Sequence, residues 1–123
     1  MPMLVKLLIG LIAAIHCYIL WFEMFAWTTR GPKIFKNFPA DLFPATKSLA
    51  ANQGLYNGFL AAGLVWSLLI RDPVWQNYVA LFFLSCVAIA GLYGTVTADK
   101  KIFFPQALPA LIAIGLLLIH LYV

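Results

Sequence analysis

The stretch that decides the fold runs from Ala50 to Trp66 and reads AANQGLYNGFLAAGLVW. Its second half is apolar enough to lie in lipid, whereas its first half carries two asparagines, a glutamine and a tyrosine within six residues. Amides inside a bilayer are costly unless another helix or a cavity satisfies them. On a helix, Gly54, Gly58 and Ala62 form a row of small residues that lets another backbone approach closely. The stretch therefore predicts a membrane-spanning helix around which the other helices are arranged.

The composition of the whole chain indicates a membrane protein with essentially no soluble part. Of its 123 residues, 64% are hydrophobic and 10% are charged, whereas a soluble domain carries about 25% charged residues. The Lys and Arg residues, which give the chain a formal net charge of +4, fall near the ends of the apolar segments. We therefore interpret them as signals of membrane topology and expect no nucleic-acid partner.

The sequence suggests no metal or cofactor. Cys17 and Cys86 lie within apolar runs and are expected to be small core residues. No CxxC motif or Cys/His cluster has the spacing of a zinc or iron–sulfur site. His16 and His120 are expected to differ by more than about 10 Å in depth, which argues against a bis-histidine haem.

The apolar segments predict an all-α fold, an integral membrane four-helix bundle that forms a single transmembrane domain over residues 1–123. The four spans are expected at about 3–27, 48–70, 74–97 and 102–123. Prolines in the segment 28–47 prevent one continuous helix, and its aromatic residues make it amphipathic, so we expect it on the membrane surface. Most Lys and Arg residues lie in the first and third loops, which places these loops in the cytoplasm and both termini on the external side.

Polar residues from all four spans are predicted to lie at one level in the cytoplasmic half of the bundle. Glu23 lies about 6 Å deep in the first span, and Asn52 and Gln53 lie at a similar depth in the second. Thr95 in the third span and Gln106 in the fourth fall within about one helical turn of that level. A second layer lies deeper, where His16, Asn57 and Tyr93 come to similar depths.

Glu23 and His16 are the candidate acid/base residues, and each has two interpretations. A carboxylate within lipid is expensive, so Glu23 is either a proton-transfer group or ligand anchor, or an interfacial residue that reaches water or pairs with Arg30. His16 lies on the same helix face and is either a proton relay to Glu23 or a hydrogen-bonded core histidine. The amides of the second span are either ligand contacts or interhelical hydrogen bonds.

Several stretches resemble a known family. The stretch His16–Thr29, which reads HCYILWFEMFAWTT, is similar to the first span of small bacterial four-helix membrane proteins catalogued as domain of unknown function 1304. The stretches Ala51–Leu64, Gly91–Gly94 and Gln106–Ala110 also match the pattern of that family, so the resemblance covers nearly the whole chain. It implies a multi-pass protein of the bacterial cytoplasmic (inner) membrane, with no established chemistry.

One position departs from the family pattern, which often has a carboxylate just before the histidine where this chain has Ile15. Glu23 is consequently the only acidic residue inside a predicted span. A weaker, architectural analogy is to the trimeric four-helix eicosanoid and glutathione enzymes of membranes. Their second span carries basic residues that bind glutathione, and none occurs between Ser48 and Ile70.

The leading hypothesis is a site for a small molecule or a lipid, with catalysis left open, in the cytoplasmic half of the bundle. Its candidate ligand-binding residues are Asn52, Gln53, Tyr56, Asn57, Tyr93, Thr95 and Gln106. The alternatives are a proton-coupled transporter that works as a dimer, and a structural or assembly subunit without a ligand. The expected partners are membrane lipid, a small-molecule ligand and further copies of the chain in a dimer or trimer.

Overall fold

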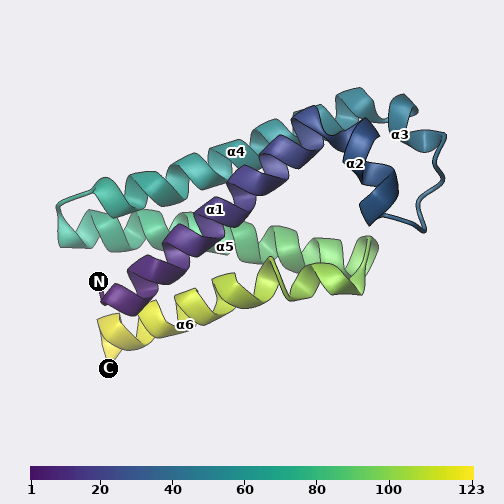
Figure 1. Ribbon diagram of the computed structural model, residues 1–123. Helices are drawn as coiled ribbons and strands as arrows, with labels where there is room; N and C mark the ends of the chain where they lie inside the picture. The colour runs from purple at the N-terminus through teal and green to yellow at the C-terminus, as the bar shows by residue number, and fades with distance from the viewer. The chain divides into compact units, whose positions relative to one another are not determined.

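The computed structural model describes residues 1–123 and is all-helical, as predicted (Figure 1). The long helices are α1 (Met3–Phe25), α4 (Lys47–Leu69), α5 (Pro73–Thr97) and α6 (Ala107–Tyr122). Their connections contain the short helices α2 (Trp27–Ile34) and α3 (Leu42–Ala45) and the 3-10 helix η1 (Lys100–Phe103). The segment 28–47 thus forms two short helices and no continuous one, as its prolines predicted.

Three of the helices are long and apolar enough to cross a membrane. They are Met3–Phe25, Pro73–Thr97 and the combined η1 and α6 segment Lys100–Tyr122, with mean hydropathies of 2.1 to 2.3. Helix α4 has a similar length of 23 residues. Its polar run from Asn52 to Asn57 makes it less apolar than the other three, although it is the helix on which the predicted bundle was centred.

The chain forms two compact units. Unit 1 comprises Met1–Ile15 and Leu60–Val123, and unit 2 comprises His16–Phe59. Helices α1 and α4 therefore each contribute one half to unit 1 and the other half to unit 2.

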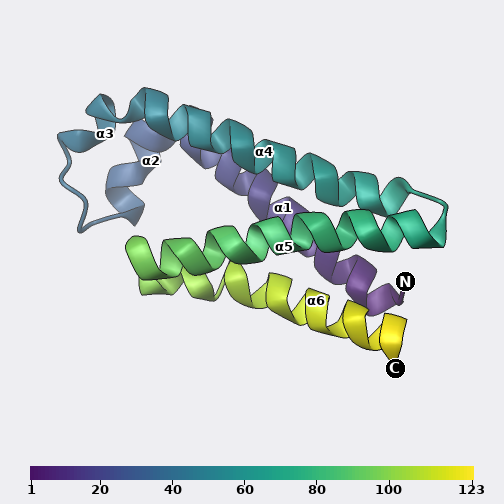
Figure 2. The same ribbon diagram turned by 180° about the vertical axis from the view of Figure 1, so that it is seen from behind.

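Unit 1 is held together by small and branched apolar side chains. Its buried core includes Ile9 and Ile12 of α1, Leu84 of α5 and Leu117 of α6, each at most 1% exposed. Helices α5 and α6 lie side by side, and both termini lie at the same end of the unit as the turn between α4 and α5 (Figures 1 and 2). This shared end matters because the two hollows described below lie there.

Helices α5 and η1 of unit 1 begin after aspartates that satisfy free backbone N–H groups. Asp72 caps α5: its Oδ1 accepts hydrogen bonds from the backbone nitrogens of Val74 at 2.9 Å and Trp75 at 3.0 Å. Pro73 follows at the first helical position, where a missing N–H is not needed. Asp99 acts similarly before η1, where its Oδ1 accepts from the backbone nitrogen of Lys101 at 2.9 Å.

Unit 2 is organised by an aromatic cluster of Phe22, Trp27, Phe35, Phe38 and Phe43. Phe43 is fully buried, and its ring centroid lies 5.1 Å from that of Trp27 and 4.8 Å from that of Phe38. The ring of Phe43 packs directly on Gly31, where a Cβ atom would overlap it. The indole Nε1 of Trp27 donates a hydrogen bond to Thr46 Oγ1 at 2.9 Å. These contacts bind the connection between α1 and α4 into the unit.

Candidate functional site

Unit 2 joins two of the predicted site residues directly. The amide Nδ2 of Asn57 donates a hydrogen bond to Glu23 Oε1 at 2.7 Å, and a second to the backbone oxygen of Gln53 at 3.1 Å. Glu23 and Asn57 are both half-buried. The carboxylate on α1 is therefore connected to α4 through a single amide, which is itself fixed against its own helix.

The contact is possible because α4 presents two glycines to α1. A Cβ atom on Gly54 would lie 3.1 Å from the backbone oxygen of Leu20 and 2.7 Å from Met24 Cγ. A Cβ atom on Gly58 would overlap Leu20 Cδ1. In the structure these glycines pack against α1 of the same chain. The third predicted member of the row, Ala62, is exposed, so the row ends at Gly58.

The other predicted site residues of α4 lie on the exposed surface of unit 2. Asn52, Gln53 and Tyr56 are all exposed, and Tyr56 makes a T-shaped contact with Phe59 at a centroid distance of 5.9 Å. Their side chains are therefore not buried between the helices of this unit. The interpretation of these amides as interhelical hydrogen bonds fits Asn57, and for Asn52 and Gln53 it stays a prediction.

Arg30 does not pair with Glu23, so that part of the interfacial interpretation was wrong, whereas the expectation that Glu23 reaches water stays a prediction. The guanidinium of Arg30 instead lies over the ring of Trp21, 5.5 Å from its centroid. The carboxylate of Glu23 accepts its hydrogen bond from Asn57. The basic residue of the loop is thus held by an aromatic face, which leaves Glu23 without a cationic partner.

His16 is fully buried. It precedes Glu23 by seven residues on α1, a separation of about 10 Å along a helix. This distance is too long for a direct hydrogen bond between the two side chains. A relay from His16 to Glu23 through another group stays a prediction.

Three of the predicted residues belong to unit 1, and one of them makes a hydrogen bond within its own helix. The hydroxyl of Thr95 donates to the backbone oxygen of Gly91, at 2.7 Å, within its own helix. Tyr93 is 70% exposed. Gln106 is half-buried and occupies the N-cap position of α6. That these three residues meet Glu23 and the amides of unit 2 stays a prediction.

The small residues of α5 leave room for another part of the backbone. A Cβ atom on Gly91 would lie 2.7 Å from the backbone nitrogen and 2.9 Å from the Cα of Ala107. The start of α6 therefore approaches α5 closely at this position. Both cysteines are free, and Cys17 is exposed, so the expectation of a core position was wrong for Cys17.

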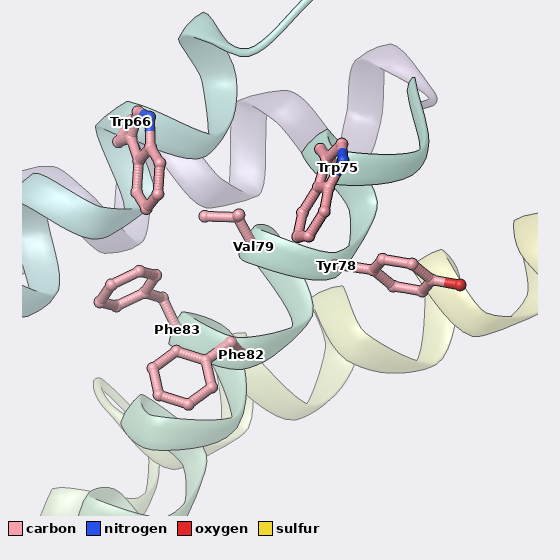
Figure 3. Close-up of a pocket in the computed structure, with 6 residues that line it drawn as sticks. All are labelled: Trp66, Trp75, Tyr78, Val79, Phe82 and Phe83. Carbon is pink, nitrogen blue, oxygen red and sulfur yellow. The ribbon is translucent and has the colours of Figure 1, made fainter. Parts of the chain in front are cut away.

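Sequence reasoning missed two hollows of unit 1 near the turn between α4 and α5. The first, of about 290 Å³, is lined by aromatic side chains and one valine: Trp66, Trp75, Tyr78, Val79, Phe82 and Phe83 (Figure 3). The second, of about 200 Å³, is lined by Val74, Asn77, Tyr78, Leu121 and Tyr122. The available signal was the amide pair Gln76 and Asn77, which lies between Trp75 and Tyr78 near the start of a predicted span.

The fold and these features define a small all-helical protein whose apolar helices are long enough to cross a membrane. The chain belongs to the family described as protein of unknown function (DUF1304), whose sequence model matches residues 10–118. It is similar to the uncharacterized protein YpaA of Lactococcus lactis subsp. lactis (strain IL1403), with 28% identity over 116 residues, or 93% of this chain and 96% of that protein. No solved structure matches the chain significantly. The family predicted from the motifs is thus confirmed.

Proposed function

We propose that this protein is a multi-pass protein of the bacterial cytoplasmic membrane that binds a small molecule or a lipid headgroup beside Glu23. In this proposal α4 is the second of the four spans of a four-helix bundle. The connections 28–47 and 98–101 lie in the cytoplasm and both termini lie outside. The observation that carries the proposal is the hydrogen bond between Glu23 and Asn57.

That hydrogen bond supports a ligand site because it leaves most of the carboxylate open. An ionised carboxylate can accept about four hydrogen bonds, and Asn57 supplies one, to Oε1. A carboxylate in a membrane-spanning helix needs further partners or water. Because Glu23 is half-buried, a ligand with hydrogen-bond donors could reach the remaining acceptor positions.

The exposed amides of α4 indicate what such a ligand would carry. Asn52 and Gln53 each offer a donor and an acceptor on the surface of unit 2, and Tyr56 adds a hydroxyl. Side chains of this kind facing lipid tails would be unsatisfied. We therefore expect a polar ligand with both donors and acceptors. If the ligand is a substrate, Glu23 and the deeper His16 are the candidate acid/base residues. Tyr93, Thr95 and Gln106 of unit 1 are the further candidate ligand contacts.

The test is native mass spectrometry of the full-length protein extracted from its own membranes in polymer-bounded discs. The wild type should retain a non-covalent mass that is lost in a variant with Asn52→Leu and Gln53→Leu. The matched control is Asn37→Leu, which makes the same amide-to-leucine change at an exposed position of the loop. Equal retention by all three proteins, each shown to be folded by circular dichroism, would contradict the proposal.

A structural or assembly role is the second candidate, and the exposure of Asn52, Gln53 and Tyr56 favours it as well. Polar side chains facing lipid can also be satisfied by another helix, so a second copy of the chain could cover them. In that case the same double variant would convert a dimer or trimer to a monomer in discs without loss of any bound mass. Proton-coupled flux into liposomes would instead favour the transporter.

A further inference from the structure

Half of the basic residues of the chain lie in one connection, the segment 28–47 between α1 and the first residue of α4. This segment holds four of the eight Lys and Arg residues and one acidic residue, Asp41. The four cations define a basic surface of unit 2, which consists of Arg30, Lys33, Lys36 and Lys47. All four side chains are exposed, and none makes an ion pair within the chain. The protein itself therefore leaves the charge of this surface uncompensated.

The aromatic cluster of unit 2 holds the backbone that carries the basic surface. Lys36 lies between Phe35 and Phe38, and the rings of both phenylalanines pack within the cluster. Lys47 directly follows Thr46, whose hydroxyl accepts the hydrogen bond from the indole of the cluster. The charges are thus attached to an ordered backbone, so less conformational freedom is lost when they meet a ligand.

Arg30 is held in a way that keeps its hydrogen-bond donors free. Its guanidinium lies over the ring of Trp21, 5.5 Å from the centroid, and donates no hydrogen bond within the chain. A guanidinium stacks on a ring through its flat face, whereas its five N–H donors lie in its plane. The contact with Trp21 therefore orients the group and leaves its donors available to the oxygens of a phosphate.

Exposed apolar side chains lie among these cations. Ile34 and Phe35 follow Lys33 and are 51% and 42% exposed, and Leu42 is 39% exposed. A nucleic acid would satisfy the cations but leave much of this apolar surface in water. A bilayer offers both kinds of contact, because the long stems of Lys and Arg let their charges reach the phosphates while apolar neighbours enter the acyl region. The mixture of side chains therefore favours a lipid surface.

The place of Trp21 in its helix agrees with a site at the headgroup level. Trp21 lies about one helical turn before the end of α1 at Phe25. Tryptophan is enriched where membrane-spanning helices meet the headgroups. A zwitterionic headgroup there would bring its own cation close to the basic surface, whereas an anionic headgroup brings net negative charge, which attracts basic segments. The charge of the surface therefore selects an anionic lipid.

We infer that the basic surface binds the headgroup of an anionic phospholipid in the cytoplasmic leaflet. The phosphate oxygens accept hydrogen bonds from the guanidinium of Arg30, and Lys33 and Lys36 add positive charge around the phosphate. Ile34 and Leu42 contact the glycerol backbone and the first carbons of the acyl chains. The inference rests on the proposed membrane location and topology, and it is independent of the ligand proposed beside Glu23.

Trp21 can report which lipid lies beside Arg30. The protein is reconstituted in dioleoyl phosphatidylcholine with the other three tryptophans replaced by phenylalanine. Quenching of Trp21 fluorescence is then compared between phosphatidylglycerol and phosphatidylcholine that carry the same dibrominated chains, at equal mole fractions. The anionic lipid should bind beside Trp21 at least about fivefold more tightly, the factor expected when one cation near the membrane surface meets an anionic lipid. Equal quenching by the two lipids would overturn the inference.

Two triple variants assign the preference to the basic surface. The first should bring the ratio of the two lipids close to one, and it carries Arg30→Gln, Lys33→Gln and Lys36→Gln. The matched control removes one exposed Arg and two exposed Lys from unit 1, and it carries Arg71→Gln, Lys100→Gln and Lys101→Gln. The control should keep the preference for the anionic lipid. An equal loss in the two variants would show that the net charge of the chain sets the preference, which would overturn the inference.

Salt tests whether the preference is electrostatic. Raising the salt concentration from about 0.1 M to about 1 M shortens the Debye length from about 10 Å to about 3 Å. The preference for the anionic lipid should consequently fall severalfold, and a ratio that does not respond to salt would contradict the inference. Absence of quenching by both lipids would contradict the proposed membrane location as well. Equal quenching by both would leave that location intact and overturn this inference alone.

A second measurement uses the wild type with all four tryptophans, so it does not depend on replacing Trp27 of the aromatic cluster. Native mass spectrometry in detergent with equimolar dioleoyl phosphatidylglycerol and dioleoyl phosphatidylcholine should show about fivefold more of the anionic lipid bound. Glycerophosphoglycerol, which has the headgroup without the chains, should not displace that lipid at equal concentration. Equal retention of the two lipids, or full displacement by the chain-free headgroup, would contradict a lipid site at the basic surface.

Discussion

The two units of this protein use different kinds of side chain to hold their helices. In unit 1 the buried residues are almost all aliphatic or small, as at Leu84, Val87 and Ala110. In unit 2 the helices are connected by the Glu23–Asn57 hydrogen bond, by two glycines against Leu20 and Met24, and by a cluster of aromatic rings.

This difference indicates which unit can replace a contact between its helices by a contact with a ligand. Lipid tails are as apolar as leucine, so helices in a membrane gain stability from close packing and from polar contacts. The close packing of unit 1 is specific to its own side chains. A polar contact such as that of Glu23 can be shared with a ligand, which is why we place the proposed site in unit 2.

The largest effect is expected in the aromatic cluster of unit 2. Phe43→Ala should lower the free energy of unfolding by about 3–5 kcal/mol, since a fully buried ring is lost and a cavity remains. The measurement is an SDS titration in mixed micelles followed by circular dichroism. Phe104→Ala is the control, because Phe104 is 68% exposed, and a similar loss in both variants would show that the cluster does not stabilise the unit.

The core of unit 1 should respond nearly as strongly. Leu84 is fully buried, so Leu84→Ala should cost about 2–5 kcal/mol in the same titration. Leu118 is 40% exposed on α6, and its replacement by alanine should have little effect. If both substitutions had little effect, close packing would not be what holds unit 1 together.

Two glycine-to-alanine substitutions test whether α6 approaches α5 closely at Gly91. Gly91→Ala should destabilise by about 1–3 kcal/mol, because the added methyl group meets the backbone of Ala107. Gly115→Ala should be neutral or stabilise by up to about 1 kcal/mol, since nothing lies within 4 Å and alanine favours the helix. Thermal denaturation in detergent would detect both, and a stabilising Gly91→Ala would contradict the close approach.

A smaller effect is expected where the loop of unit 2 meets α1. Arg30→Gln should cost about 0.5–1 kcal/mol, the usual value of an exposed contact between a cation and an aromatic ring. Lys33→Gln removes an equally exposed charge from the same short helix and should cost less. Acrylamide should quench the fluorescence of Trp21 more strongly in Arg30→Gln than in the wild type, and Lys33→Gln should not change it. The measurement is made in a background that lacks the other three tryptophans.

The sequence was sufficient to predict the helices and part of the candidate site. Apolar run length and the prolines located the four long helices to within a few residues, because both act locally. The spacing of Gly54 and Gly58 predicted a close helix contact. It could not identify the partner helix, since the same spacing serves contacts within and between chains.

Side-chain orientation limited the prediction of the site. Depth along a helix placed Glu23, Asn52 and Gln53 together, but depth does not specify which way a side chain points. In the structure Asn57 turns toward Glu23, whereas Asn52 and Gln53 are exposed on α4. Asn77 was missed because the adjacent amides Gln76 and Asn77, near the end of an apolar run, resemble interfacial residues, and the unpaired oxygen of Asn77 appears only in three dimensions.

The most direct test of the central claim is a double-mutant cycle on Glu23 and Asn57. The free energy of unfolding is measured in lipid–detergent micelles for the wild type, Glu23→Gln, Asn57→Leu and the double variant. The account predicts a coupling energy of about 0.6–1.7 kcal/mol for this pair, and a value near zero for the control pair Glu23 and Asn52. A coupling of zero between Glu23 and Asn57, or equal couplings in the two cycles, would contradict the account.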